Sequence, residues 1–129
     1  MRPKLPVNDD KFYWTRHAID KMRYYGISES IIKRIIRYPK RLEEGVAPDT
    51  FAGMMPAGSP KRPQEVWVMY QKNAKRKAKR EKLLSGKIII ISAWRYPGIS
   101  PVREKIPIPQ DVLGEIEEVM KELQRDNSL

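Results

Sequence analysis

The sequence predicts an α+β fold in which an N-terminal helix pair packs on a small antiparallel sheet and an amphipathic helix follows at the C-terminus. Apolar residues at helical spacing occur near both ends of the chain. Between them lie β-branched and aromatic runs that favour strands. Because helical and strand patterns are separated along the chain, an antiparallel sheet covered by helices is favoured over alternating parallel units.

The helix pair is predicted from its ends as well as from its spacing. Thr15 is a suitable N-cap for a helix over residues 16–25, and Gly26 supplies the left-handed residue that commonly closes a helix. Ser28 then caps a second helix whose isoleucines share one face, and Pro39 stops it from continuing. Two short helices in succession are therefore expected.

Strands are predicted mainly in the middle of the chain. Residues 65–71 alternate between two apolar sets, and residues 87–94 form a β-branched run that is typical of a central strand covered on both faces. We expect these two strands to pair as a hairpin. Prolines and glycines within residues 39–64 argue against long regular elements there. Shorter strands are predicted over residues 12–15, 41–44 and 50–54.

The C-terminal helix is predicted over residues 109–126, from an apolar stripe at helical spacing. The stripe comprises Val112, Leu113, Ile116, Val119, Met120 and Leu123. A chain of 129 residues has room for one core, so residues 1–129 are interpreted as a single domain.

The composition indicates a cytoplasmic protein without a membrane-spanning segment. There is no cysteine, and no apolar run approaches the roughly 20 residues that cross a bilayer. The basic N-terminus is followed by no apolar signal core. Neither a metal nor a cofactor is expected, because acidic pairs such as Asp9-Asp10 lack histidine partners and no glycine-rich phosphate loop occurs. The oligomeric state stays open.

The charge balance points to a polyanionic partner. Lysine and arginine number 26 against 16 acidic residues, giving a formal net charge of +10. Such a chain attracts phosphate backbones through neutralisation and counterion release, although the charge can also serve solubility alone. The basic loop over residues 72–86 is a second signal, typical also of solvated loops. Candidate nucleic-acid-binding residues are Arg16, Arg23, Lys33, Arg34, Arg37, Lys75, Arg76, Lys77, Lys79 and Arg80.

Catalytic candidates surround the single histidine. His17 titrates near neutral pH and can act as a general base, with Lys21 one helical turn away. Arg95, at the end of the apolar strand, can hold a phosphate, and Tyr96 or Tyr70 can serve as an acid. The alternatives stay open: His17 is a capping or partly buried structural residue, and Arg95 is an ordinary surface residue while Trp94 and Tyr96 simply pack.

A family resemblance rests on short motifs. His17-Ala18, Met22 and Gly26-Ile27-Ser28, before an isoleucine-rich helix, resemble the opening of the domain of unknown function 4258. Strands within residues 66–94 match its closing hairpin in order, so the resemblance covers about residues 12–96. More distantly, such domains resemble RelE and BrnT type toxins of toxin-antitoxin pairs. Tyr25 stands where the family commonly has an arginine, so that arginine's role is not carried over.

The resemblance implies a small ribonuclease fold in which His17 is the family's matching histidine. Combined with the charge, it leads to the hypothesis of a toxin-like, metal-independent endoribonuclease that acts on RNA through 2′-hydroxyl attack. Two alternatives remain: a non-catalytic nucleic-acid-binding module, and a partner-binding protein whose basic face docks an acidic antitoxin-like protein.

Overall fold

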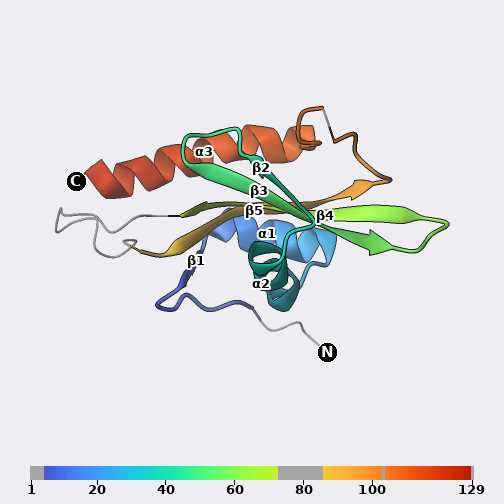
Figure 1. Cartoon of the computed structure of the whole chain (residues 1–129). Helices are drawn as coiled ribbons and strands as arrows, with labels where there is room; N and C mark the ends of the chain where they lie inside the picture. Colours follow the sequence, from blue (N-terminus) through green and yellow to red (C-terminus); the bar gives the residue numbers. More distant parts are fainter. Residues whose placement is uncertain (1–4, 73–85, 103, 129) are drawn as a thin grey trace.

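The chain folds into three layers, as seen in a computed structural model that describes residues 5–72, 86–102 and 104–128 (Figure 1). The predicted α+β class is confirmed. A five-stranded sheet in the order β1-β5-β4-β3-β2 lies between α1 and α2 on one face and α3 on the other (Figure 1). The elements are β1 (Phe12–Trp14), α1 (Arg16–Tyr25), α2 (Glu29–Arg37), β2 (Arg41–Glu44), β3 (Thr50–Gly58), β4 (Pro63–Lys72), β5 (Ile88–Pro97) and α3 (Gln110–Ser128). Within the described ranges, no helix is both long enough and apolar enough to cross a membrane.

The sheet is mixed, which corrects the expectation of a purely antiparallel one. Strands β2 to β5 pair antiparallel with their neighbours, and β4 and β5 form the predicted hairpin pair. The first strand instead pairs parallel with β5, Phe12 opposite Ile88 and Trp14 opposite Ile90. A parallel pair needs a long crossover between its strands, and the elements from α1 to β4 supply it.

The predicted ends of α1 and α2 are confirmed. Thr15 Oγ1 accepts a hydrogen bond from the Ala18 backbone N–H at 3.1 Å, and Gly26 closes α1 with a φ of 66°. Ser28 Oγ accepts from the backbone N–H of Ile31 at 3.3 Å and caps α2. Both helices therefore begin and end where short-range chemistry directs them to.

β3 is longer than the sequence predicts, so the expectation that residues 39–64 hold no long regular element is wrong. The strand runs through Gly53 and Pro56. A Cβ at Gly53 would lie only 3.1 Å from Ile35 Cγ2, so glycine lets α2 pack closely on β3. β2 pairs with β3 only as far as Met54. Pro56 therefore lies where β3 is an edge strand, and a missing N–H is tolerated there.

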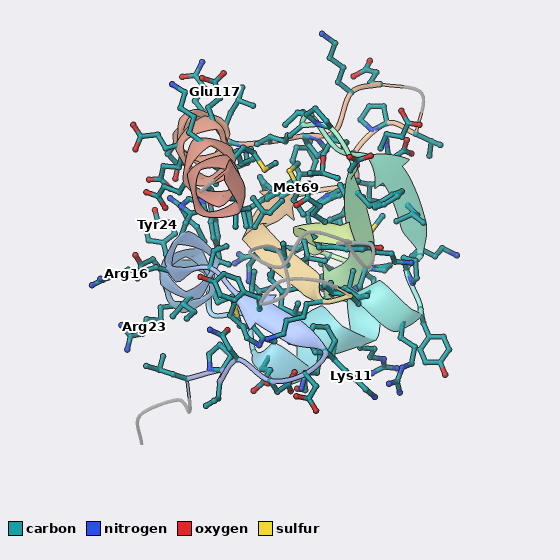
Figure 2. All side chains as sticks on the ribbon, turned by 90° about the vertical axis from the view of Figure 1, so that its left-hand side faces the viewer. Lys11, Arg16, Arg23, Tyr24, Met69 and Glu117 are labelled. Atoms are coloured by element: carbon teal, nitrogen blue, oxygen red, sulfur yellow. The ribbon has the colours of Figure 1, made fainter. Side chains whose placement is uncertain are left out.

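Each face of the sheet carries its own hydrophobic core. Alternation along β4 sends Val66 and Val68 to the α1–α2 side, and Trp67 and Met69 to the α3 side. This confirms the predicted division into two sets, while the helices that each set faces come from the structure. Figure 2 shows Met69 within the layer between the sheet and α3. β5 is buried on both faces, which confirms the prediction of a covered central strand.

α3 packs through a narrower stripe than expected. Val112, Ile116, Val119 and Leu123 are buried against the sheet. Leu113 is 43% exposed, so its inclusion in the buried stripe was wrong. Successive residues of a helix point about 100° apart. Val112 faces the sheet, so Leu113 lies at the margin of the helix face that contacts the sheet and stays partly exposed.

Candidate functional site

Two helices that are far apart in the sequence place four charged or titratable side chains together. His17 and Lys21 project from α1 toward α3, and each side chain is only 12% exposed. Glu115 Oε2 lies 2.7 Å from His17 Nδ1 and 3.3 Å from Lys21 Nζ. Asp111 Oδ2 lies 2.7 Å from Lys21 Nζ. His17, Lys21, Asp111 and Glu115 are called the α1–α3 cluster below.

The second nitrogen of the imidazole is also occupied. His17 Nε2 lies 3.0 Å from the hydroxyl of Ser92, which is fully buried on β5. A neutral imidazole with its proton on Nδ1 satisfies both contacts, donating to Glu115 and accepting from Ser92. The Ser92–His17–Glu115 order matches that of a hydrolase triad. Because Ser92 is buried, its hydroxyl is out of reach of a substrate and orients the ring instead.

The electrostatics of the α1–α3 cluster favour a neutral imidazole beside a charged ammonium. Burial lowers the pKa of His17 and outweighs the opposing effect of Glu115. Burial also acts to lower the pKa of Lys21, but the hydrogen bonds that Lys21 donates to Asp111 and Glu115, together with the charges of these carboxylates, outweigh burial and raise the pKa. The hydrogen bond from Lys21 lowers the pKa of Asp111. At neutral pH the cluster therefore holds an uncharged base next to a cation neutralised by two carboxylates.

Arg95 lies at the opposite end of α1 from His17. Its Nε donates to the backbone carbonyl of Tyr25 at 2.7 Å, and a terminal nitrogen donates to that of Gly26 at 3.0 Å. These carbonyls belong to the last residue and the C-cap of α1, where helices leave acceptors without internal partners. His17 lies in the first turn, about 12 Å away along the axis. The structure therefore does not bring Arg95 to the imidazole.

The two candidate tyrosines lie on opposite faces of the sheet. Tyr70 is 3% exposed and packs against Phe51 on the α1–α2 side, with ring centroids 5.9 Å apart. Burial raises the pKa of Tyr70. Tyr96 is partly buried on the α3 side. Of the predicted catalytic residues, the structure brings together His17 and Lys21.

The predicted binding cations on α1 and α2 are largely exposed. Figure 2 shows Arg16 and Arg23 pointing away from the protein. In the described part of the chain, the four exposed arginines of these two helices have no carboxylate oxygen within 4.0 Å. Lys33 differs, because Glu29 lies 3.1 Å from its ammonium. The name "cationic surface" below refers to Arg16, Arg23, Arg34 and Arg37.

The candidates in the basic loop lie outside the described residues. They are Lys75, Arg76, Lys77, Lys79 and Arg80.

Sequence reasoning missed the α3 members of the cluster and Ser92. The available signal was the spacing: Asp111 and Glu115 are four residues apart, as are His17 and Lys21. Residues four apart share a helix face, so the two helices present complementary pairs.

Among the described residues, no group of His, Asp and Glu suited to holding a metal ion is found. Comparisons with protein-family models, curated proteins and solved structures find no match for this chain.

Proposed function

We propose that the protein binds RNA through α1 and α2. The observation that carries the proposal is the set of four exposed arginines of the cationic surface, two on α1 and two on α2, which have no carboxylate oxygen within 4.0 Å in the described ranges. Guanidinium groups bind phosphate oxygens bidentately, and each phosphate they neutralise releases counterions. The formal net charge of +10 adds long-range attraction to the same partner.

Exposed aromatic rings favour RNA with unpaired bases as the form that is bound. Tyr24 is 76% exposed on α1, and the ammonium of Lys21 lies 5.7 Å from its ring centroid. Figure 2 shows Tyr24 on the same side of the protein as Arg16 and Arg23. A ring in this position offers a stacking surface to a base while the arginines hold the backbone.

The test is the salt dependence of RNA binding. Arg34→Gln with Arg37→Gln removes two exposed cations of α2, and the slope of log K against log salt should become shallower by about 0.7 for each phosphate that is no longer neutralised. Lys105→Gln with Lys121→Gln is the matched control, because it removes the same charge from exposed sites near and on α3. Equal slopes for the two double variants would contradict binding through α1 and α2.

A second candidate function is metal-independent RNA cleavage, favoured by one observation: His17 and Lys21 both contact Oε2 of Glu115, and burial lowers the pKa of His17. In this reaction His17 takes the proton of a ribose 2′-hydroxyl, and that oxygen attacks the adjacent phosphorus. The bond to the 5′-oxygen breaks, leaving a 2′,3′-cyclic phosphate, and a proton from the imidazolium or water completes the leaving alcohol. Lys21 stabilises the added charge on the phosphorus oxygens.

Cleavage requires the first turns of α3 to leave the imidazole, because Glu115 covers Nδ1 and the buried hydroxyl of Ser92 stays at Nε2. Nδ1 is then the base, in the tautomer whose proton lies on Nε2 and is donated to Ser92. Asp111→Asn with Glu115→Gln weakens that contact, so this variant should cut RNA in the presence of a chelator and leave cyclic phosphate ends. Adding His17→Ala should abolish the activity. The control is Glu117→Gln with Glu118→Gln, which removes equal charge from exposed positions of α3. Cutting that survives His17→Ala would exclude His17 as the base.

A further inference from the structure

A pocket of about 470 Å³ opens beside the cationic surface. It lies where the N-terminal segment, the end of α1 and the beginning of α2 meet. Leu5, Ile19 and Met22 supply apolar walls, while Ser28 and Ser30 contribute hydroxyls. The volume is within the range of roughly 300–1,000 Å³ that is typical of small-molecule sites.

The lining suits a flat ring with polar edges. Apolar side chains can cover the faces of such a ring, and hydroxyls can form hydrogen bonds with its rim. Ser28 Oγ lies 3.1 Å from Ser30 Oγ, so two hydroxyls that can donate or accept lie together. Glu29 also lines the pocket, but its charge is balanced by Lys33 at 3.1 Å.

The pocket and the α1–α3 cluster lie on opposite sides of α1. With about 100° between successive residues, Ile19 and Met22 face the pocket while His17 and Lys21 face α3. Between these two sides runs an exposed ridge that comprises Arg16, Asp20, Arg23 and Tyr24. A polynucleotide that crosses α1 thus meets the pocket first, then the guanidinium groups of Arg16 and Arg23 with Asp20 between them, and then the ring of Tyr24.

We infer that this pocket receives one unpaired nucleobase of a bound RNA strand, with the adjoining phosphate on Arg23. The inference rests on the proposed RNA binding and adds a base-recognition site to it. Arg23 lines the pocket and is exposed, so it can hold a phosphate while the attached base lies against Ile19 and Met22. Single-stranded RNA is therefore bound more tightly than an equally charged polymer without bases.

The test compares two polyanions and two variants. Ser30→Phe places a ring in the pocket from an exposed position of α2 without changing charge. Ser59→Phe is the matched control, at an exposed position between β3 and β4. For single-stranded RNA, Ser30→Phe should weaken binding about tenfold, within the range measured for loss of one stacked base. Binding of inorganic polyphosphate should change less than about twofold, and Ser59→Phe should leave both affinities unchanged.

The outcomes separate the pocket from the proposed function. RNA binding that Ser30→Phe leaves unchanged, in a protein that still binds RNA with salt dependence, overturns the pocket and leaves the proposed function standing. Equal weakening toward RNA and polyphosphate also overturns the pocket, because bases would then contribute nothing. Failure of the unmodified protein to bind either polymer overturns both proposals. Thermal melting of Ser30→Phe near that of Ser59→Phe confirms that the variants are folded.

Discussion

His17 is held between opposing electrostatic effects. Burial favours its neutral form, and the carboxylate of Glu115 at 2.7 Å favours the protonated one. The first effect is the larger, so a contact that looks like an ion pair holds an uncharged ring at neutral pH. The sequence could identify this residue as titratable, but its partners come from α3 and β5 and are distant in the chain.

Replacing Glu115 should therefore lower the pKa of His17 further. Glu115→Gln keeps the size of the side chain and removes the charge that stabilises the imidazolium. An NMR titration of the imidazole C–H protons measures the change. Glu117→Gln is the control, since Figure 2 shows Glu117 on the outer side of α3. A pKa that rises in Glu115→Gln would contradict this electrostatic role of the carboxylate.

Arg95 is predicted to matter for stability through the end of α1. Arg95→Gln removes the hydrogen bonds to the carbonyls of Tyr25 and Gly26, and should cost about 2 kcal/mol in the free energy of unfolding. Urea denaturation measures this cost. Arg34→Gln, at an exposed site, should change stability by less than about 0.5 kcal/mol. Equal effects of the two changes would refute the capping role.

At the scale of elements, local chemistry explains what the sequence could predict. The caps Thr15, Gly26 and Ser28 act within a few residues, and all three lie where expected. The sequence predicts too short a length for β3, because the continuity of this strand depends on α2 packing against Gly53 and on the edge position of Pro56. Neither condition can be read from a stretch of proline and glycine alone.

The inner face of α3 is expected to contribute strongly to stability. Ile116 is 1% exposed in the α3-side core, so Ile116→Ala should lower the free energy of unfolding by about 2–5 kcal/mol. Leu113→Ala removes similar apolar volume from a side chain that is 43% exposed, and should cost less than about 1 kcal/mol. Chemical denaturation of the two variants tests the difference. A similar decrease in both would mean that α3 buries a broader face than described.

At the scale of the whole molecule, the layers determine which charges meet. The acidic residues of α3 were visible in the sequence as a local concentration, and the exposed arginines of α1 and α2 as part of the surplus. Which acids pair with which bases depends on two helices approaching across an edge of the sheet. This is why His17 and Lys21 could be selected from sequence, while the four-residue spacing of Asp111 and Glu115 did not by itself show which bases they pair with.

Acid should weaken the packing of these layers. His17 has a folded-state pKa below its ordinary value of 6.5, so the unfolded chain binds more protons as the pH falls through that value. The contribution of the neutral His17 ring to the free energy of unfolding is therefore fully present above pH 6.5 and decreases as the pH falls below this value. Thermal melting at neutral and mildly acidic pH should show a decline that is smaller in His17→Asn. An identical decline in both proteins would assign it to other groups.

The parallel pairing of β1 with β5 has a consequence for synthesis on the ribosome. Thr15 Oγ1 donates to the backbone carbonyl of Ile90 at 2.8 Å, so the beginning of α1 is anchored to residues made much later. A nascent chain that ends before Ile88 lacks the strand on which β1 and α1 dock. α1 must therefore wait, undocked, until β5 has emerged, and this high contact order favours slow, late consolidation of β1 and α1.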